Sequence, residues 1–195
     1  MTKTETKKSL RRELCGAEQQ LSDAYKRRSD KAIAAGVMAL PEYQTAGTVF
    51  CYVSTAGEID TRTVLRDAFR RGKRVCVPLC VAKGRMELRE ISSLDELVPG
   101  TYGIPEPTDA CPRVDTDSVD FAVVPCVCCN RSGHRLGRGG GYYDQFLATY
   151  RAAAVLVCRE RLLRDEIPME THDSIVPWVI TERGLYEDGT PARPE

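Results

Sequence analysis

Residues 130–144, Asn-Arg-Ser-Gly-His-Arg-Leu-Gly-Arg-Gly-Gly-Gly-Tyr-Tyr-Asp, have the composition of an anion-binding loop. Glycine lets the backbone approach a ligand closely and turn its N–H groups toward it. The loop has four glycines close together: Gly137, Gly139, Gly140 and Gly141. A helix is predicted to begin just after them, so its N–H donors and the positive end of its dipole point to the same place. The pattern predicts a site of the kind that holds phosphate.

The charged residues of this loop agree with that prediction. Arg131, Arg135 and Arg138 supply positive charge with no acidic residue among them. Asp144, one turn into the helix, could hold a metal ion that bridges phosphate oxygens. The loop is not a Walker A motif, because no Gly-Lys-Ser/Thr follows. A flexible loop with solvated arginines is the alternative, and His134 is equally open to contact with the ligand and to solvation.

The N-terminal segment adds cations that a helix terminus does not normally favour. Lys7, Lys8, Arg11 and Arg12 fall in the first turns of a predicted helix, where the macrodipole prefers negative charge. A solvated helix face accounts for such a run in the ordinary way. The alternative is that these cations meet a phosphate held by another part of the fold, and the residues leave both interpretations open.

Apolar patterning predicts the elements that position these residues. Residues 3–40 are expected to form one long helix followed by a turn, because apolar side chains recur on one face at three- and four-residue steps. After Pro41, strand and helix patterns alternate. The expected strands are residues 48–53, 74–79, 86–91, 121–127, 152–157 and 175–180, and the expected helices are residues 61–71 and 142–150.

This order of elements predicts a single three-layer α/β domain over residues 1–195, with a mostly parallel central sheet and right-handed crossovers. Residues 121–127 form the most hydrophobic strand and are expected at the centre of the sheet. Ligands of such sheets bind outside the carboxyl ends of the strands, which is where the glycine-rich loop follows. Residues 1–6 and 185–195 are expected to fray.

Composition excludes several classes of partner. Lys and Arg total 28 and Asp and Glu total 28, so the chain as a whole does not attract nucleic acid or an anionic membrane. No apolar run is long enough to cross a bilayer, and the charged N-terminus lacks the apolar core of a secretory signal. We therefore expect a cytoplasmic monomer that acts on small molecules and holds any polyanion with a local cluster of cations.

The cysteines are predicted to be structural. Nine cysteines would indicate disulfides in a secreted chain, but the count is odd and several of them lie inside apolar runs. Cys126, Cys128 and Cys129 suggest a metal cluster, yet no second pair follows at the spacing of a zinc site. We therefore expect reduced thiols in the core, without a metal.

The stretch Arg-Leu-Gly-Arg-Gly-Gly-Gly-Tyr-Tyr-Asp-Gln-Phe-Leu, residues 135–147, closely resembles the signature of the 5-formyltetrahydrofolate cyclo-ligase family, whose members are also called methenyltetrahydrofolate synthetases. Weaker matches follow the family's order over residues 7–182: residues 7–11, 58–61, 103–107 and 167–173. The resemblance implies that ATP and 5-formyltetrahydrofolate give 5,10-methenyltetrahydrofolate, ADP and phosphate, with Mg²⁺. ATP would phosphorylate the formyl oxygen, the N10 nitrogen would attack the activated carbon, and phosphate would leave.

The resemblance also implies roles for individual residues. Arg138 would steady the transferred phosphoryl group as the catalytic residue, and Asp144 and Asp173 would be the Mg²⁺ ligands. The residues expected to contact ATP are Lys7, Lys8, Arg11, Arg135, Gly137, Arg138, Gly139, Gly140, Gly141, Tyr142 and Tyr143. Those expected in the folate pocket are Val53, Glu58, Tyr102 and Tyr142.

The chain departs from the family pattern just before the loop. Residues 126–130 are Cys-Val-Cys-Cys-Asn, where relatives often have residues of the Gly-Phe-Asp type. Asn130 in place of a carboxylate removes a negative charge beside the phosphate site, so turnover or metal affinity is expected to differ. Two other functions are compatible with an anion loop at a strand end. One is a sugar-phosphate isomerase or CoA-transferase-like enzyme without ATP, and the other is a nucleotide- or folate-binding protein with weak turnover.

Overall fold

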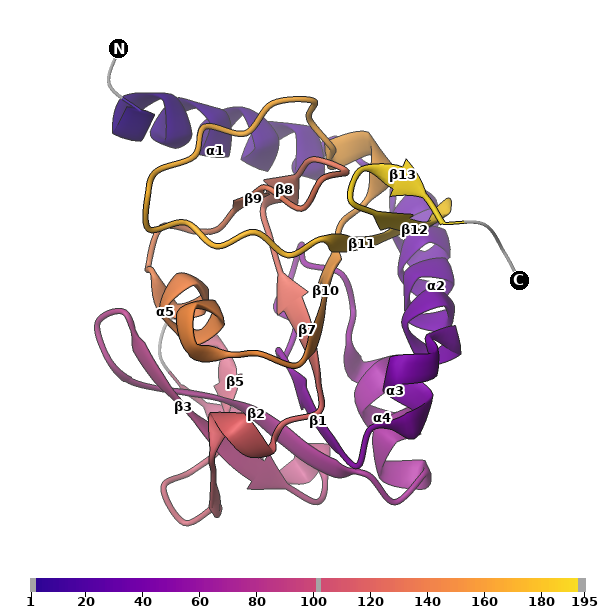
Figure 1. The fold of residues 1–195 in the computed structure, drawn as a ribbon, viewed down its shortest axis with the longest axis vertical. Coiled ribbons are helices and arrows are strands. Elements are labelled where there is room, and N and C mark those ends of the chain that lie inside the picture. The colour runs from indigo at the N-terminus through magenta and orange to yellow at the C-terminus, as the bar shows by residue number, and fades with distance from the viewer. Residues whose placement is uncertain (1–2, 101–102, 193–195) are drawn as a thin grey trace.

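In the computed structural model, which describes residues 3–100 and 103–192, the chain folds around a nine-stranded sheet (Figure 1). The order of its strands is β13-β12-β11-β10-β7-β1-β2-β3-β6. These strands are β1 Thr48–Cys51, β2 Arg74–Ala82, β3 Arg85–Ile91, β6 Arg113–Val114, β7 Phe121–Pro125, β10 Ala153–Val157, β11 Trp178–Thr181, β12 Gly184–Glu187 and β13 Thr190–Pro191. Two small hairpins lie beside the sheet, formed by β4 Val98–Pro99 with β5 Pro105–Glu106 and by β8 Cys128–Cys129 with β9 Arg135–Leu136.

The middle of the sheet is parallel. β11, β10, β7, β1 and β2 run in the same direction. The remaining strands pair antiparallel at the two edges. β7 is the central strand, and residues 121–124 are fully buried, as their continuous apolar sequence predicted. The expected parallel sheet and the central place of this strand are confirmed, although β7 already ends at Pro125.

Helices cover both faces of the sheet and make the three layers that the sequence predicted. The α-helices of the described residues are α1 Lys3–Gln19, α2 Asp23–Ala39, α3 Pro41–Thr45, α4 Arg62–Arg70 and α5 Tyr142–Thr149. Side chains alternate between the faces along a strand, so Val49 packs in the core under α2, α3 and α4, whereas Phe50 packs in the core under α1 and α5. Figure 1 shows α1 beside the β8–β9 hairpin, with α2, α3 and α4 grouped on the right of the view.

The first helical segment is two helices rather than the single long helix expected for residues 3–40. α2 begins directly after Ser22, its N-cap, whose Oγ accepts a hydrogen bond from the backbone N–H of Tyr25 at 3.3 Å. Serine followed by an acidic residue stabilises a helix start, and here it overrides the apolar periodicity that continues through Leu21. The break allows α1 to cover one face of the sheet and α2 the other.

The C-terminal segment is paired, where residues 185–195 were expected to fray. β12 and β13 continue the sheet antiparallel to β11, and Tyr186 of β12 is 8% exposed in the core. β11 begins at Trp178, three residues after the expected start at Ile175, which is exposed. At the other end of the chain, α1 is already helical at Lys3. Hydrogen bonds to an existing sheet edge therefore order a segment that has little apolar sequence of its own.

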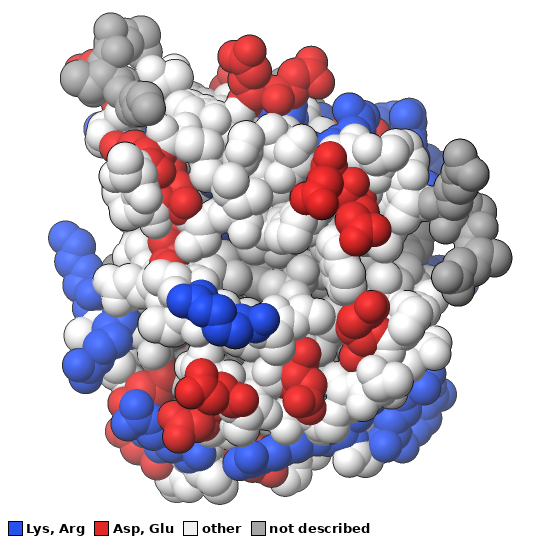
Figure 2. All heavy atoms as spheres, viewed as in Figure 1, with Lys and Arg blue, Asp and Glu red and all other residues white. Residues whose placement is uncertain are grey.

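Charged side chains are mixed over the surface. On the face shown in Figure 2, basic and acidic residues are interspersed rather than gathered by sign. Among residues 3–100 and 103–192, no helix combines the length and the apolar character that a membrane span requires. An anion that binds on this face must therefore be attracted by a local group of cations.

Candidate active site

The glycine-rich loop joins the β8–β9 hairpin to α5 at the carboxyl end of β7. α5 begins at Tyr142, directly after Gly141, as the sequence predicted. Gly139 and Gly141 have φ angles of +95° and +74°, a region that favours glycine. A Cβ on Gly140 would lie 2.6 Å from the ring of Tyr142, so this position also requires glycine. The first-turn N–H groups of α5 consequently lie at the end of the loop, where an anion is favoured.

Arg135 anchors the loop from inside. Its side chain is 3% exposed, its Nη2 donates to Asp144 Oδ1 at 2.5 Å, and its guanidinium lies over the ring of Tyr143. A Cβ on Gly137 would lie 2.8 Å from Arg135 Nη1, which leaves room only for glycine. The buried Nε of Arg135 has no hydrogen-bond partner among the described residues. Arg135 and Asp144 were predicted as ligand contacts and here contact each other, with one donor of Arg135 unused.

Cations of α1 reach the loop from the opposite side. Arg11 Nε donates to the carbonyl of Gly137 at 2.7 Å, and a Cβ on Gly139 would lie 3.3 Å from Arg11 Cζ. Lys8 and Arg12 are exposed, as a solvated helix face would be. The cations of the N-terminal segment therefore have different surroundings. Arg11 contacts the glycine-rich loop, whereas Lys8 and Arg12 face solvent.

Lys7 binds the loop that precedes β11. Its Nζ lies 2.5 Å from Asp173 Oδ2 and 2.6 Å from Glu170 Oε2, and its side chain is 7% exposed. Burial alone lowers the pKa of Lys7, but the two carboxylates outweigh burial and raise it above the usual lysine value. Burial alone raises the pKa of Asp173, but the hydrogen bond and charge of Lys7 hold it below the usual range. All three groups are therefore charged at neutral pH.

Glu170, His172 and Asp173 form a cluster that the sequence predicted only in part. Each offers one ligand atom, and these atoms lie within 4.8 Å of one another. Glu170 was missed, since it lies in an irregular segment where no periodic pattern marks it. Asp144, the other predicted Mg²⁺ ligand, is in an adjoining segment, because its backbone carbonyl accepts a hydrogen bond from Ser174 Oγ at 3.4 Å. Each predicted metal ligand is thus held in an ion pair with a basic side chain.

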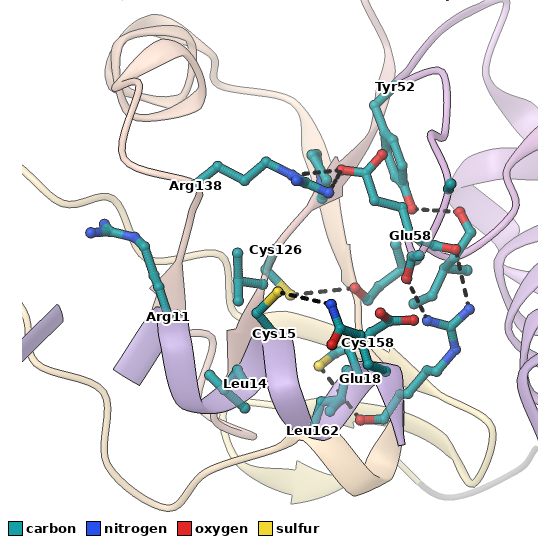
Figure 3. A pocket seen from close by; sticks show the side chains of 18 residues that line it. Arg11, Leu14, Cys15, Glu18, Tyr52, Glu58, Cys126, Arg138, Cys158 and Leu162 are labelled. Atoms are coloured by element: carbon teal, nitrogen blue, oxygen red, sulfur yellow. Dashed lines mark hydrogen bonds and ion pairs between the residues drawn. The ribbon is translucent and has the colours of Figure 1, made fainter. Parts of the chain in front are cut away.

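A pocket of about 420 Å³ lies between α1 and the segments that follow β1, β7 and β10 (Figure 3). Arg11 borders it from α1 and Arg138 from the glycine-rich loop, so the pocket adjoins the predicted phosphate site. Its apolar lining includes Leu14, Tyr52, Ile59, Val127 and Leu162. No sequence pattern indicated Tyr52, whose hydroxyl donates to the carbonyl of Ile59 at 2.9 Å.

An ion pair in this pocket connects two residues predicted for different substrates. Arg138 Nη2 lies 3.1 Å from Glu58 Oε1, and the two side chains are 65% and 17% exposed. The other carboxylate oxygen of Glu58 accepts hydrogen bonds from the backbone N–H and the hydroxyl of Thr55. Arg159, which is buried, donates to the backbone carbonyls of Gly57 and Glu58 at 3.0 and 3.1 Å. Glu58 is therefore fixed at both its side chain and its backbone.

Val53 and Tyr142, two other predicted folate contacts, do not line this pocket. Val53 is 4% exposed in the core under α4, and its neighbour Tyr52 lines the pocket. Tyr142 lines a smaller hollow of about 200 Å³ between α5, β3 and the β6 segment. Tyr143 is packed against the core, where burial raises its pKa above the usual tyrosine range. Tyr102 lies outside the described residues.

Asn130 closes the turn of the β8–β9 hairpin. Its Oδ1 accepts a hydrogen bond from the backbone N–H of His134 at 2.9 Å, and its Nδ2 donates to the carbonyl of Asp165 at 3.4 Å. His134 Nδ1 lies 3.0 Å from the same Nδ2, so the imidazole packs on the turn. A carboxylate at this position could accept from the turn but could not donate to Asp165. The departure from the family pattern therefore has a structural role in this chain.

Comparisons with known proteins agree with the resemblance seen in the sequence. The model of the 5-formyltetrahydrofolate cyclo-ligase family matches residues 3–182. The 5-formyltetrahydrofolate cyclo-ligase of Escherichia coli K12 is 30% identical over 157 residues, which cover 77% of this chain and 86% of that protein. The mouse 5-formyltetrahydrofolate cyclo-ligase is 27% identical, with 96% of this chain and 97% of that protein covered.

The fold is also similar to solved structures of this family. The NMR structure of 5,10-methenyltetrahydrofolate synthetase from Aquifex aeolicus is similar with a TM-score of 0.84 at 27% identity, and the match covers 97% of this chain and 96% of that one. The enzyme of the same name from Mycoplasma pneumoniae shares the fold with a TM-score of 0.73 at 18% identity, over 90% and 98% of the two chains. Because the family model spans nearly the whole chain and the architecture agrees, this chain belongs to the 5-formyltetrahydrofolate cyclo-ligase family.

Proposed function

We propose that this protein catalyses the ATP-dependent cyclisation of 5-formyltetrahydrofolate to 5,10-methenyltetrahydrofolate, with release of ADP and phosphate. Family membership supports the reaction, because relatives carry the name of that ligase. The observation that carries the proposal is the meeting of the glycine-rich loop, Arg11 and Arg138 at a pocket of about 420 Å³. A pocket of this size suits a small-molecule substrate.

The phosphates of ATP are assigned to the glycine-rich loop. The N–H groups at the start of α5, the guanidinium groups of Arg11 and Arg138, and the unused Nε of Arg135 supply donors and positive charge. Lys7 and Arg135 offset charge on the nearby carboxylates of Asp173 and Asp144, which weakens the repulsion of the nucleotide. Lys7 approaches the site as the cation that holds Glu170 and Asp173, whereas Lys8, which faces solvent, stays a predicted ATP contact.

The pterin of the folate is assigned to the pocket beyond the loop. Leu14, Ile59 and Val127 offer apolar walls for a flat ring, as ligand pockets usually do. Glu58 offers a carboxylate that accepts hydrogen bonds from the amino and ring N–H groups of the pterin. The formyl group would then face the loop, because Arg138 pairs directly with Glu58.

The Arg138–Glu58 ion pair supports a coupling between the two substrates. Arg138 is largely exposed and has no buried partner to hold it, so its guanidinium can turn from Glu58 to the γ-phosphate. Glu58 would keep its hydrogen bonds from Thr55 and accept the pterin donors in place of the arginine. Each charged group therefore exchanges one partner for another, and none is left buried and unpaired.

The proposed chemistry makes few demands on a protein base. The formyl oxygen attacks the γ-phosphorus and ADP leaves. N10 then bonds to the formyl carbon, and phosphate departs with the original formyl oxygen and takes up the proton that N10 loses. Such transfers depend mainly on the positioning of the reactants and on neutralisation of the phosphoryl charge. Arg138 is the residue that we assign to that charge, with Arg11 fixing the shape of the loop through the carbonyl of Gly137.

The acidic residues beside the loop fit a divalent cation. A bound Mg²⁺ would neutralise charge on the phosphate oxygens, and Asp144, Asp173 and Glu170 offer the carboxylate oxygens that it prefers. The ammonium of Lys7 lies between Glu170 and Asp173 and holds the pKa of both carboxyls below the usual range. Both carboxylates are therefore charged and stabilise a cation placed between them. We propose that these carboxylates hold Mg²⁺ when ATP is bound.

A turnover assay combined with calorimetry tests the proposal. Formation of 5,10-methenyltetrahydrofolate, followed by its ultraviolet absorbance, should require both ATP and Mg²⁺ and should release one phosphate for each product. Titration calorimetry should show separate binding of ATP and of 5-formyltetrahydrofolate. Conversion without nucleotide would exclude an ATP-dependent ligase, and binding of both ligands without product would indicate a binding protein.

We further propose that the protein works as a monomer in a reducing compartment such as the cytoplasm. All nine cysteines are free thiols in the structure, which suits a reducing environment. We assign all of the proposed substrate contacts to residues in and beside this one pocket, which supports a site that is complete within one chain. Light scattering coupled to size-exclusion chromatography measures the oligomeric state directly, and a dimer at assay concentration would contradict the proposal.

A further inference from the structure

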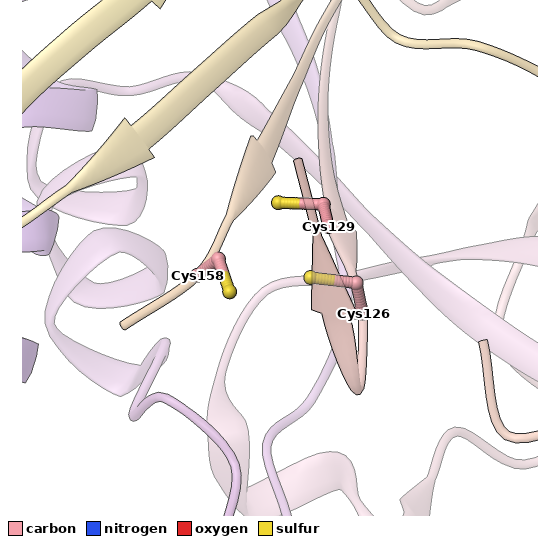
Figure 4. A group of neighbouring side chains, drawn as sticks. All are labelled: Cys126, Cys129 and Cys158. Atoms are coloured by element: carbon pink, nitrogen blue, oxygen red, sulfur yellow. The ribbon is translucent and has the colours of Figure 1, made fainter. Parts of the chain in front are cut away.

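Three cysteines meet beside the pocket, and two of them, Cys126 and Cys158, line it. β7 and β10 are parallel neighbours with Pro125 opposite Val157, so the next residues, Cys126 and Cys158, leave the sheet side by side. Cys129 reaches the same point from β8, which directly follows. The three Sγ atoms lie within 4.8 Å of one another, and Figure 4 shows the sulfurs of Cys126 and Cys129 pointing toward Cys158.

The spacing of these sulfurs matches thiolate coordination of a metal ion. A metal–sulfur bond of about 2.3 Å places tetrahedral sulfurs about 3.8 Å apart and trigonal sulfurs about 4.0 Å apart. The separations in the cluster have an upper limit of 4.8 Å, so a small rotation of the side chains is enough to bring all three into contact with one ion. Cys126 and Cys129 also have the Cys-x-x-Cys spacing common in zinc sites, and Cys158 supplies the ligand that no local pattern revealed.

The cluster differs from the other buried cysteines of the chain. Cys51, Cys76 and Cys128 are each fully buried and belong to no such group among the described residues. Cys126 and Cys158 instead line the pocket, which gives an ion a path of entry. Their Sγ atoms lie 3.4 and 3.6 Å from backbone carbonyls, and the three thiols also interact with one another, so the side chains that a metal ion would gather are already in contact.

We propose that Cys126, Cys129 and Cys158 form a binding site for a soft, thiophilic d¹⁰ cation of the Zn²⁺ class. Thiolate ligands select such ions over Mg²⁺, so the site would not compete for the metal of the phosphate loop. Three protein ligands leave a fourth position open, and the partly exposed Cys126 turns that position toward the pocket. Three thiolates and a dication carry one net negative charge, which Arg138 and Arg11 face from the same pocket.

The position of the site has a consequence that rests on the proposed function. An ion beside the pocket, with its fourth ligand directed inward, occupies space assigned to the pterin. Binding of the soft metal should therefore weaken the binding of 5-formyltetrahydrofolate while leaving ATP binding unchanged. The protein would be inhibited by thiophilic metals through these three thiols and not through the Mg²⁺ ligands.

Cadmium titration of the reduced protein tests the site without any substrate. We expect one equivalent of Cd²⁺ to produce a saturable ultraviolet thiolate-to-metal charge-transfer band of three-thiolate intensity, and Zn²⁺ to displace it. Cys126→Ser, Cys129→Ser and Cys158→Ser should each lose that intensity. Cys128→Ser is the matched control, because Cys128 is fully buried beside Cys129 but lies outside the cluster, and Cys15→Ser controls for an exposed thiol in the pocket.

Two further measurements keep the outcome clear. Circular dichroism and a parallel Cys→Ala set establish that a variant which loses the band is still folded. Calorimetry of 5-formyltetrahydrofolate with and without Cd²⁺ should show weaker binding in wild type and no change in Cys158→Ser. A wild-type protein without a saturable one-equivalent band, or a band that persists in the triple serine variant, overturns the site. If the metal-free protein does not bind 5-formyltetrahydrofolate, the proposed function is contradicted. The charge-transfer band then still tests the metal site.

Discussion

Arg159→Ala tests whether a buried guanidinium holds the Glu58 segment in place. Arg159 is 2% exposed and is satisfied on all sides by four partners. Its Nη2 donates to Asp30 Oδ1 at 2.6 Å, its Nε donates to Ser29 Oγ at 3.2 Å, and two further bonds reach the carbonyls of Gly57 and Glu58. The substitution removes every one of these bonds and leaves Asp30 without its cation.

The size of the effect follows from those partners. Loss of one member of a buried ion pair costs roughly 3–5 kcal/mol, because the remaining charge stays buried. The carbonyls of Gly57 and Glu58 also lose a hydrogen-bond donor. Their loss costs less than full desolvation, because Arg159 borders the pocket and water can reach the space that it leaves. We expect the free energy of unfolding to fall by about 3–4 kcal/mol, which for a chain of this size lowers Tm by roughly 6–16 °C.

Urea unfolding followed by circular dichroism measures this loss, and pH separates its causes. Burial raises the pKa of Asp30, and the charge of Arg159 partly opposes it. Without Arg159 the folded-state pKa of Asp30 rises further above its unfolded value, so the folded variant binds an extra proton as pH falls. Stability of Arg159→Ala should therefore recover, relative to wild type, as the pH falls toward the raised folded-state pKa of Asp30, and the deficit should be largest above that pKa.

Two comparisons make the result decisive. Arg159→Ala combined with Asp30→Ala should be less destabilised than the sum of the two single variants, because no buried charge remains unpaired. Arg62→Ala is the control, since its ion pair with Asp60 is about half exposed and should contribute no more than about 1 kcal/mol. Wild-type stability for Arg159→Ala, or additive effects in the double variant, would refute the reasoning. In the folded variant, the KM for 5-formyltetrahydrofolate should rise, because the backbone at Glu58 is released.

The remaining predictions concern the proposed substrates. Arg138→Ala should lower kcat by roughly 10²–10³-fold with little loss of folate affinity, since the guanidinium is assigned to charge on the transferred group, and Arg138→Lys should restore only part of the rate. Asp173→Asn and Asp144→Asn should each raise the Mg²⁺ concentration that half-maximal activity requires, and unchanged Mg²⁺ titrations in both would remove the metal assignment. Glu58→Gln should raise the KM for 5-formyltetrahydrofolate and leave that for ATP unchanged, and the reverse pattern would exchange the two halves of the site.

Features with a strong local cause were predictable from the sequence. The continuous apolar run at residues 121–124 indicated a strand buried on both faces, and it is the central one. The glycines before Tyr142 indicated a loop followed by a helix, because two of them need a left-handed φ. The break at Ser22 had a local signal too, but a continuous apolar stripe on both sides of it favoured one helix. β12 was missed because its order comes from pairing with β11, which no local pattern contains.

Residues of the site that depend on distant partners were harder to predict. Glu58 and Arg138 were assigned to different substrates, and only the fold shows that they pair across 80 positions of sequence. Cys158 joins Cys126 through the register of two parallel strands, which a sequence does not reveal. Tyr52 and Val53 are both buried in one core cluster beyond the end of β1, and only Tyr52 also lines the pocket, a difference that no periodic pattern indicates. Placement of Tyr102 stays a prediction.

The proposed function explains why basic and acidic side chains are paired in the site. Lys7 pairs with Asp173, Arg135 with Asp144 and Arg138 with Glu58, so three of the basic residues expected at ATP each hold a carboxylate expected at Mg²⁺ or folate. Opposite charges brought together in this way keep a partly buried site neutral, which avoids the cost of burying either sign alone. When a triphosphate and a dication enter together, the basic groups can turn to phosphate oxygens and the carboxylates to the metal, and the dication offsets part of the negative charge that the triphosphate brings. ATP entering without the metal would have to compete with all three carboxylates for the same cations, and this physical argument links nucleotide affinity to Mg²⁺.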